Sequence, residues 1–190
     1  MRVLGIDPGM SGGCAIFCAN ATVPTPPDGI IDMPITGEDS LKRVDYVALR
    51  DWIYAMQPTH VVIERVWAQP MMPGRSKGND AAAAAGWGAK VNFTLGGAFH
   101  AACAVVVCLG HEPELAPKTR WSKMYPRLQR TGKDDDRDMK EEARLLAIED
   151  EPAIEPFLKR KKDHGRAEAW LIARWRADQL MRQEDENIGQ

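Results

Sequence analysis

Acidic residues stand at three places where this sequence could carry out chemistry. Asp7 and Glu64 each follow a short apolar run, and Asp163 and Glu168 flank the start of the last helical segment. Converging carboxylates repel one another unless a cation binds between them, and hard oxygen ligands select Mg²⁺ or Mn²⁺. Two such ions about 3.5–4 Å apart can activate water and stabilise the leaving oxygen in phosphodiester hydrolysis. The pattern therefore indicates metal-dependent hydrolysis, provided that the fold brings these residues together.

Two of these carboxylates are predicted to end neighbouring buried strands. Residues 1–7 have the pattern of a short strand that ends at Asp7, and residues 60–64 form a β-branched strand that ends at Glu64. The helical periodicity of residues 41–56 places a helix between them, which favours parallel pairing of the two strands. Both side chains would then leave the sheet at the same edge.

Each acidic residue also has a purely structural interpretation, which the sequence leaves open. Asp7 begins an Asp-Pro-Gly turn, and Glu64 could pair with Arg65 or with a lysine. Asp163 could cap the final helix, and Glu168 could be an exposed helix residue.

The other predicted elements extend the sheet and cover it. Residues 12–18 form a hairpin with the first strand, and a third strand at residues 30–33 would complete an antiparallel meander. Further elements are listed here in chain order: a helix from residue 81 to about 102, a helix end or strand at 103–109, an edge strand at 112–117, a helix at 139–148, and a helix to about 181.

Basic residues are concentrated in local clusters. The span 118–133 has six basic residues and no acid, with aromatic residues interleaved, and a second cluster lies at 159–162. The net charge of −2 excludes a protein that binds nucleic acid over its whole surface, so binding would use such patches. The predicted DNA contacts include Lys118, Arg120, Lys123, Lys133, Lys161 and Lys162, with Arg75 and Lys77 in the loop after residue 67. The alternative is that the 118–133 run is only a solvated face.

Chain length and composition limit the class of protein. The 190 residues suffice for one domain, expected at 1–182, followed by a polar tail at 183–190. The sequence shows no signal peptide, no apolar run near the ~20 residues that span a membrane, and no cysteine spacing typical of a zinc site. We therefore expect a cytoplasmic protein without membrane contact, whose four cysteines are reduced core thiols.

Four motifs in order resemble the RuvC family of Holliday junction resolvases, over nearly the whole chain. The matching residues are Gly5-Ile6-Asp7-Pro8-Gly9, Val62-Ile63-Glu64-Arg65-Val66-Trp67, Leu115-Ala116-Pro117, and Lys161-Lys162-Asp163-His164-Gly165-Arg166-Ala167-Glu168-Ala169. The tryptophan-containing loop and the Arg-Ala-Glu-Ala ending are more similar to phage or organelle members than to the common bacterial form.

The resemblance implies both a fold and an activity. The fold would be α/β and RNase H-like, with a central mixed five-stranded sheet flanked by helices. The activity would be that of a homodimeric, Mg²⁺-dependent endonuclease, with Mn²⁺ as a substitute, that nicks four-way junctions and thus binds branched DNA. Trp67 would stack on a base at the junction. The sequence does not identify a partner helicase.

The last motif departs from the family pattern, which carries two acids, or a histidine and an acid, about one helical turn apart. Glu168 takes the final acid position, but Gly165 stands three residues earlier. His164 shares a helix face with Glu168, whereas Asp163 does so only if it precedes the helix. His164 is thus a candidate base or acid, or merely a partner of Glu168. The predicted catalytic set is Asp7, Glu64, Asp163, His164 and Glu168, with Asp7, Glu64, Asp163 and Glu168 as metal ligands.

Two other functions compete with this interpretation. Sugar kinases and actin-like ATPases also begin with a strand ending in Gly-Ile-Asp-x-Gly, but they use two such domains around a nucleotide, and the sequence has no second phosphate-binding Asp-x-Gly at the end of an apolar strand. A non-catalytic junction-binding or RNA-processing relative would keep the fold and lose a carboxylate, whereas the acidic set here is intact.

Overall fold

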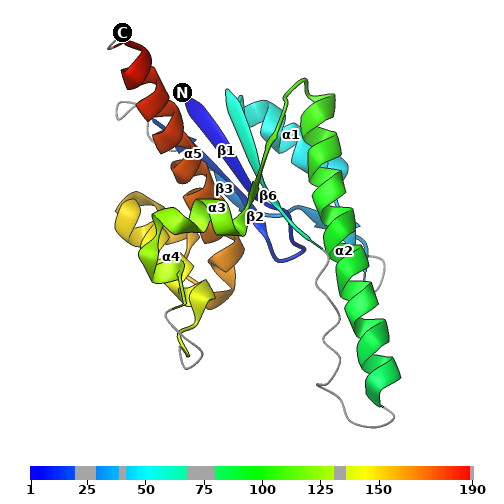
Figure 1. Cartoon of the computed structure of the whole chain (residues 1–190). Coiled ribbons are helices and arrows are strands. Elements are labelled where there is room, and N and C mark those ends of the chain that lie inside the picture. Colours follow the sequence, from blue (N-terminus) through cyan, green and yellow to red (C-terminus); the bar gives the residue numbers. More distant parts are fainter. Residues whose placement is uncertain (20–28, 39–41, 68–79, 131–135, 189–190) are drawn as a thin grey trace.

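The computed structural model describes residues 1–19, 29–38, 42–67, 80–130 and 136–188, with no side chains described for 80–88 or 188. A five-stranded mixed sheet with the strand order β3-β2-β1-β6-β7 forms its centre (Figure 1). The strands are β1 (Arg2–Asp7), β2 (Gly13–Cys18), β3 (Ile30–Asp32), β6 (His60–Arg65) and β7 (Glu114–Pro117). The predicted hairpin, meander, parallel pair and edge strand are confirmed.

The register of the parallel strands brings two acidic residues to one edge. Ile6 of β1 pairs with Ile63 of β6, so that the next residues, Asp7 and Glu64, both emerge at the carboxyl edge of the sheet. β7 pairs in parallel with β6, and it also ends at this edge. Residues that follow three neighbouring strands can therefore meet there.

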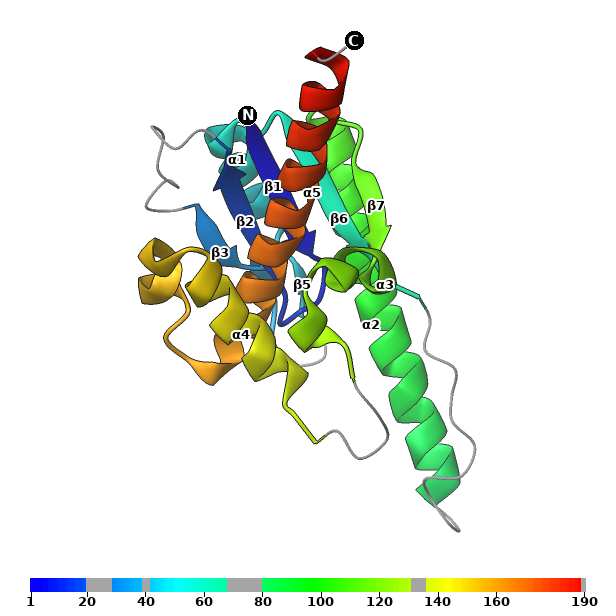
Figure 2. The same cartoon turned by 60° about the vertical axis from the view of Figure 1, so that its left-hand side comes forward.

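Helices cover both faces of the sheet, as Figures 1 and 2 show. On one face lie α1 (Tyr46–Met56) and α2 (Asp80–Cys108); on the other lie α5 (His164–Ile188) and, packed against it, α4 (Met139–Asp150). Alternate residues of β1 supply the two cores, since Val3 packs with α5 and Leu4 packs with α1 and α2. The short helix α3 (Lys118–Trp121) follows β7.

The remaining short elements connect these layers. A two-stranded sheet pairs β4 (Ile35–Thr36) with β5 (Arg43–Val44). Short 3-10 helices occupy Ser122–Met124, Pro126–Leu128, Pro152–Phe157 and Lys161–Asp163.

Several boundaries differ from the sequence prediction for local reasons. The helix predicted from residue 41 begins at Tyr46, because the Asp45 side chain accepts hydrogen bonds from the first-turn amides. Cys103 continues α2 rather than starting a strand, and that helix ends at Cys108. α5 runs on through the predicted polar tail as far as Ile188.

α2 shows that two expectations were wrong: the chain does contain an apolar run of about 20 residues, and not every cysteine lies in the core. Its segment Ala89–Cys108 has 20 residues and a mean hydropathy of 1.7, which makes it long and apolar enough to cross a membrane by length and composition alone. The alternation of alanine, glycine and valine with single polar residues hid this run in the sequence. Only 28% of the segment is buried, with Phe93 84% and Val107 58% exposed. Cys108 at its end is exposed, whereas Cys14 is a buried thiol as predicted.

Glycines allow α5 to approach the sheet edge closely. A side chain at Gly165 would collide with the carbonyl oxygen of Ser11 and the backbone of Gly12, with which Gly165 forms an isolated bridge. A side chain at Gly5 would likewise meet the carbonyl oxygen of Ala169. The departure of the last motif thus has a steric cause, because position 165 has no room for an acidic side chain.

Candidate active site

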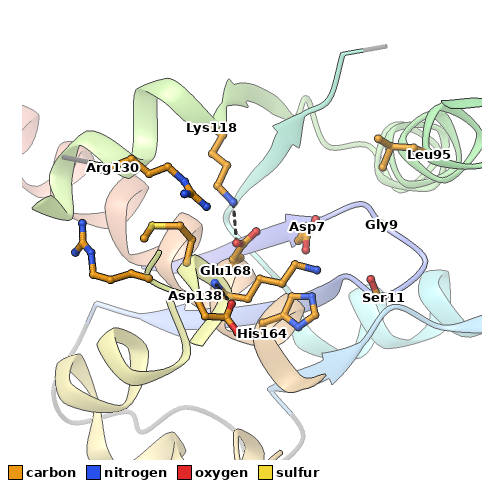
Figure 3. Close-up of a pocket in the computed structure, with 12 residues that line it drawn as sticks. Asp7, Gly9, Ser11, Leu95, Lys118, Arg130, Asp138, His164 and Glu168 are labelled. Atoms are coloured by element: carbon orange, nitrogen blue, oxygen red, sulfur yellow. Dashed lines mark hydrogen bonds and ion pairs between the residues drawn. The ribbon is translucent and has the colours of Figure 1, made fainter. Parts of the chain in front are cut away.

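A pocket of about 500 Å³ opens at the carboxyl edge of the sheet, where Asp7 and Glu168 lie (Figure 3). Asp7 enters it from the end of β1, Glu168 from the first turns of α5, and Lys118 from the start of α3. The lining residues are Asp7, Gly9, Ser11, Leu95, Lys118, Arg130, Arg137, Asp138, Met139, Lys140, His164 and Glu168. Asp7, His164 and Glu168, three residues of the predicted catalytic set, thus share one cavity.

Mutual repulsion and burial perturb the two strand-end carboxylates. Burial and the Glu168 charge raise the pKa of Asp7 to about 7, although Lys118 and the Gly9 amide act in the opposite direction. Burial and the Asp7 charge raise the pKa of Glu64 to about 8. A cation bound between such acidic groups would relieve their mutual repulsion.

Lys118 supplies positive charge at this site. Its Nζ donates a hydrogen bond to Glu168 Oε1 at 2.7 Å, drawn as the dashed line in Figure 3, and lies 5.5 Å from the centroid of the Trp121 ring. Burial alone would lower the pKa of Lys118, but Glu168, with Glu64 and Asp7, outweighs it and raises that pKa. The sequence analysis predicted Lys118 as a DNA contact; the structure places it among the carboxylates.

Trp121 is a site residue that the sequence analysis missed. Its indole Nε1 donates a hydrogen bond to Glu64 Oε2 at 3.0 Å, and its side chain is fully buried. Lys118 and Trp121 stand three residues apart on α3 and thus contact the two carboxylates together. The edge strand predicted before them could have indicated this position. Because β7 runs parallel to β6, the residues that follow β7 lie at the same edge of the sheet as Glu64.

Asp163 lies elsewhere, and the structure does not support it as a metal ligand. Its side chain is 1% exposed and accepts bonds from the Arg160 backbone amide at 2.8 Å and from the Arg160 guanidinium at 2.9 and 2.6 Å. Burial would raise the pKa of Asp163, yet the Arg160 hydrogen bonds lower it. Its carboxylate therefore closes the 3-10 turn before α5 and does not line the pocket.

Arg166 anchors the start of α5 across the sheet. Its guanidinium makes two hydrogen bonds to the Asp32 carboxylate, each of 2.6 Å, and a third to the Phe157 carbonyl at 3.0 Å. Such a bidentate pair restricts orientation as well as distance. The pair holds the first turn of α5, and with it Glu168, against the edge where β1 ends.

The predicted DNA contacts fall into different environments. Trp67 is 56% exposed and is therefore not a core residue, and the Arg65 guanidinium lies 3.9 Å from its ring centroid. Lys123 and Lys162 are exposed, and within the described part of the chain no ion pair involves either. Arg75, Lys77 and Lys133 lie outside the described residues.

Two predicted contacts are engaged by acidic residues of the chain. Arg120 pairs with Glu114 at 3.0 Å, and Lys161 pairs with Asp138 at 2.9 Å. Arg120 also lies over the Trp175 ring, at 5.3 Å from its centroid. The span 118–133 contains no acidic residue in the sequence, but in the structure acidic residues from other elements form ion pairs with its basic side chains.

The donor set suits a hard divalent cation, although the present arrangement is not that of a metal centre. Among the described residues, no group of three His, Cys, Asp or Glu side chains is placed to hold a metal ion. Lys118 Nζ and Trp121 Nε1 instead donate hydrogen bonds to carboxylate oxygens of Glu168 and Glu64. The carboxylate oxygens fit Mg²⁺ or Mn²⁺, and the Lys118 ammonium would have to leave Glu168 for a cation to bind there.

The strand order, the layers of helices and the carboxylates at the ends of β1 and β6 define an α/β protein of RNase H-like fold. Among solved structures, Thermus thermophilus RuvC in complex with a Holliday junction substrate is similar to this chain, with a TM-score of 0.55 and 14% sequence identity over 95% of this chain and 96% of that one. A second structure of T. thermophilus RuvC has a TM-score of 0.47 and 16% identity over 91% of each chain. No protein-family model and no curated protein matches the sequence.

Proposed function

We propose that this protein is a metal-dependent endonuclease that cuts branched DNA, with the four-way junction as its substrate. The observation that carries the proposal is that Asp7 and Glu168 share one pocket at the carboxyl edge of the sheet, while Glu64, near the end of the neighbouring strand and outside the pocket lining, is close enough that, besides burial, the charges of Asp7 and Glu168 raise its pKa. The RuvC of similar fold is bound to a Holliday junction, which supports the choice of substrate.

Each side chain at the site would have a separate role in hydrolysis. Asp7, Glu64 and Glu168 would hold Mg²⁺ or Mn²⁺, which supplies Lewis acidity and a water molecule of lowered pKa. Lys118, released from Glu168, is placed to neutralise a phosphate oxygen. His164 lines the same pocket and can hydrogen-bond the attacking water or the leaving oxygen.

Further basic side chains of the pocket would position the DNA backbone. Arg130, Arg137 and Lys140 also line the pocket, and Lys140 belongs to the first turn of α4. Lysine and arginine at such a position bind phosphates without reading sequence. The protein would therefore recognise the path of the strands at the junction, rather than one nucleotide sequence, through these residues.

A homodimer is part of the proposal, because two symmetric nicks need two active sites. The outer face of α2 carries the exposed Phe93 and Val107, and a second copy of this chain would cover it. We expect wild type to sediment as a dimer and Phe93→Glu as a monomer that no longer makes paired cuts. A wild-type monomer, or binding of the chain to lipid vesicles through this face, would contradict the dimer and leave the nuclease assignment standing.

Cleavage of a labelled four-way junction beside a linear duplex of the same sequence tests the activity. Wild type with Mg²⁺ should cut the junction, and Asp7→Asn should bind it without cutting. The exposed Asp51, which pairs with Arg50, gives the matched control Asp51→Asn, which should cut normally. With Ca²⁺, wild type should bind and not cut, because looser coordination misplaces the reacting water. Cutting by Asp7→Asn would reject the site, and binding without any cutting would favour a non-catalytic relative.

A further inference from the structure

Glu114, the first residue of β7, joins α3 and α5 to the central sheet. Its Oε1 pairs with Nη1 of Arg120 on α3 at 3.0 Å, and its Oε2 pairs with Nε of Arg176 on α5 at 2.6 Å. The backbone of Glu114 is fixed in the sheet, where it pairs with Val62 of β6. Figure 2 shows α3 directly after β7 and beside α5, and one carboxylate thus connects all three elements.

The orientation of α3 depends on such contacts, because the helix spans only the four residues Lys118–Trp121. Isolated helices shorter than about 12 residues are marginally stable in water, so neighbouring elements must hold this turn in place. Lys118 and Trp121 contact the carboxylates of the site from one side of the turn. Arg120 lies two residues after Lys118 and therefore leaves the turn in another direction, toward Glu114.

Arg120 gives α3 a second attachment to α5. Its guanidinium lies 5.3 Å from the centroid of the Trp175 ring, and Trp175 is a buried residue of α5 that directly precedes Arg176. A guanidinium can pair with a carboxylate and pack on an aromatic ring at the same time. With the Lys118–Glu168 bond alone, the turn could rotate about that single contact, whereas two contacts with α5 restrict its rotation.

We infer that Glu114 is a positioning residue: through Arg120 it fixes the orientation of α3 and thereby the side chains that this helix presents to the carboxylates. The inference rests on the proposed nuclease function and assigns to that site a residue outside the pocket lining. Lys118 has to leave Glu168 before a cation can bind there, and this attachment of α3 is then lost. The pair of Arg120 with Glu114 remains, and it keeps the Lys118 ammonium beside the phosphate to be cut.

NMR of the tryptophan indole N–H groups measures the orientation of α3 without metal or DNA. The chain has six tryptophans, and Trp121→Phe identifies the Trp121 signal by its loss. In EDTA, Glu114→Gln should accelerate hydrogen exchange of this indole about 2- to 30-fold, the range for residues that act on a site through connected side chains. The signal should also shift, because the bond to Glu64 opens more often.

Glu142→Gln is the matched control for this measurement. The Glu142 side chain is 20% exposed, against 25% for Glu114, and it also pairs with an arginine, but that arginine is Arg127 and not a residue of α3. The control should leave the Trp121 signal and its exchange rate unchanged. An equal change in both variants would show a general loss of stability.

Arg120→Gln removes the same ion pair from its other side. It should accelerate exchange of the Trp121 indole, and Glu114→Gln should add little in that background, because residues that act through one contact give non-additive effects. Arg120→Gln also keeps the pair of Glu114 with Arg176, so it serves as the test if Glu114→Gln does not fold. Fully additive effects of the two substitutions would contradict the inference.

Cleavage of a four-way junction with Mg²⁺ connects this orientation to function. Glu114→Gln should lower kcat about 2- to 30-fold and leave KM within about 2-fold, because Lys118 is misplaced for the transition state while junction binding persists. Glu142→Gln should match wild type in both constants. An unchanged Trp121 signal in Glu114→Gln, or an effect on KM alone, would overturn the positioning role. Wild type that does not cut would reject the nuclease function, and the indole signal would still decide whether Glu114 orients α3.

Discussion

The indole N–H of Trp121 bonds to Glu64 across 57 positions of sequence, at 3.0 Å. Glu64 lies near the end of β6, Trp121 follows the parallel neighbour β7, and Lys118, one turn before Trp121, bonds to Glu168. α3 thus contacts two carboxylates of the site, Glu168 through Lys118 and Glu64 through Trp121. If Glu64 binds a metal ion, the Trp121 indole would contribute to metal affinity by orienting that carboxylate without touching the ion.

Removal of the indole donor should weaken metal binding more than it weakens the fold. Trp121→Phe keeps an aromatic ring in the core and leaves Glu64 without its hydrogen bond, so we expect the Mg²⁺ concentration for half-maximal cleavage to rise about 10- to 100-fold. Trp175→Phe is the matched control, because Trp175 is equally a buried tryptophan but contacts Arg120 rather than a carboxylate. An equal rise in both variants would show that the effect is loss of packing.

The raised pKa values predict how stability of the metal-free protein depends on pH. Asp7 and Glu64 bind protons more tightly in the folded chain, with pKa values of about 7 and about 8, than in the unfolded chain, where the pKa is near 4. Their contribution to the free energy of unfolding is complete below about pH 4 and is lost as the pH rises to about 8. The loss of Tm between pH 5 and pH 8 should be smaller in Asp7→Asn than in wild type.

Differential scanning calorimetry in EDTA and in Mg²⁺ checks this prediction. The comparison uses the change of Tm with pH in wild type minus that in Asp7→Asn. This difference removes the contribution of residues such as Asp163, whose lowered pKa makes stability change with pH in the opposite direction. About 1 kcal/mol corresponds to about 2–4 °C in a chain of this size, so the difference should amount to several degrees. Mg²⁺ should reduce it, because the cation offsets the repulsion. Parallel Tm curves for the two proteins would contradict the electrostatic account.

The sequence predicted the part of the site that strand patterns determine. Asp7 and Glu64 each end an apolar run, and one crossover helix suffices to place them side by side. Asp163 could not be assigned in this way, because its partner Arg160 depends on a 3-10 turn that has no hydrophobic periodicity. The role of Trp121 was hidden for a different reason, since its neighbours in sequence are basic and its partner Glu64 comes from another strand.

Salt dependence should separate the exposed basic residues from those engaged in ion pairs. Lys123→Gln should lower the slope of log affinity against log salt by about one unit, because the side chain is free to contact a phosphate. Arg120→Gln should leave the slope unchanged, because Arg120 pairs with Glu114 and lies over Trp175. Filter binding to one junction at several salt concentrations measures both slopes. A unit change for Arg120→Gln would mean that its ion pair opens when DNA binds.

Asp163 and Glu168, five residues apart, should give opposite results when their charges are removed. Glu168→Gln should abolish cleavage and leave the Tm nearly unchanged, because its carboxylate faces Asp7 and Lys118 in the pocket. Asp163→Asn should keep cleavage but lower stability by about 1–3 kcal/mol, because Arg160 loses a charged, hydrogen-bonded partner. Cleavage rates with Mg²⁺ and with Mn²⁺, together with urea unfolding of both variants, test the pair. Loss of cleavage in a stably folded Asp163→Asn would restore Asp163 to the site, and near-normal turnover by Glu168→Gln would remove Glu168 from it.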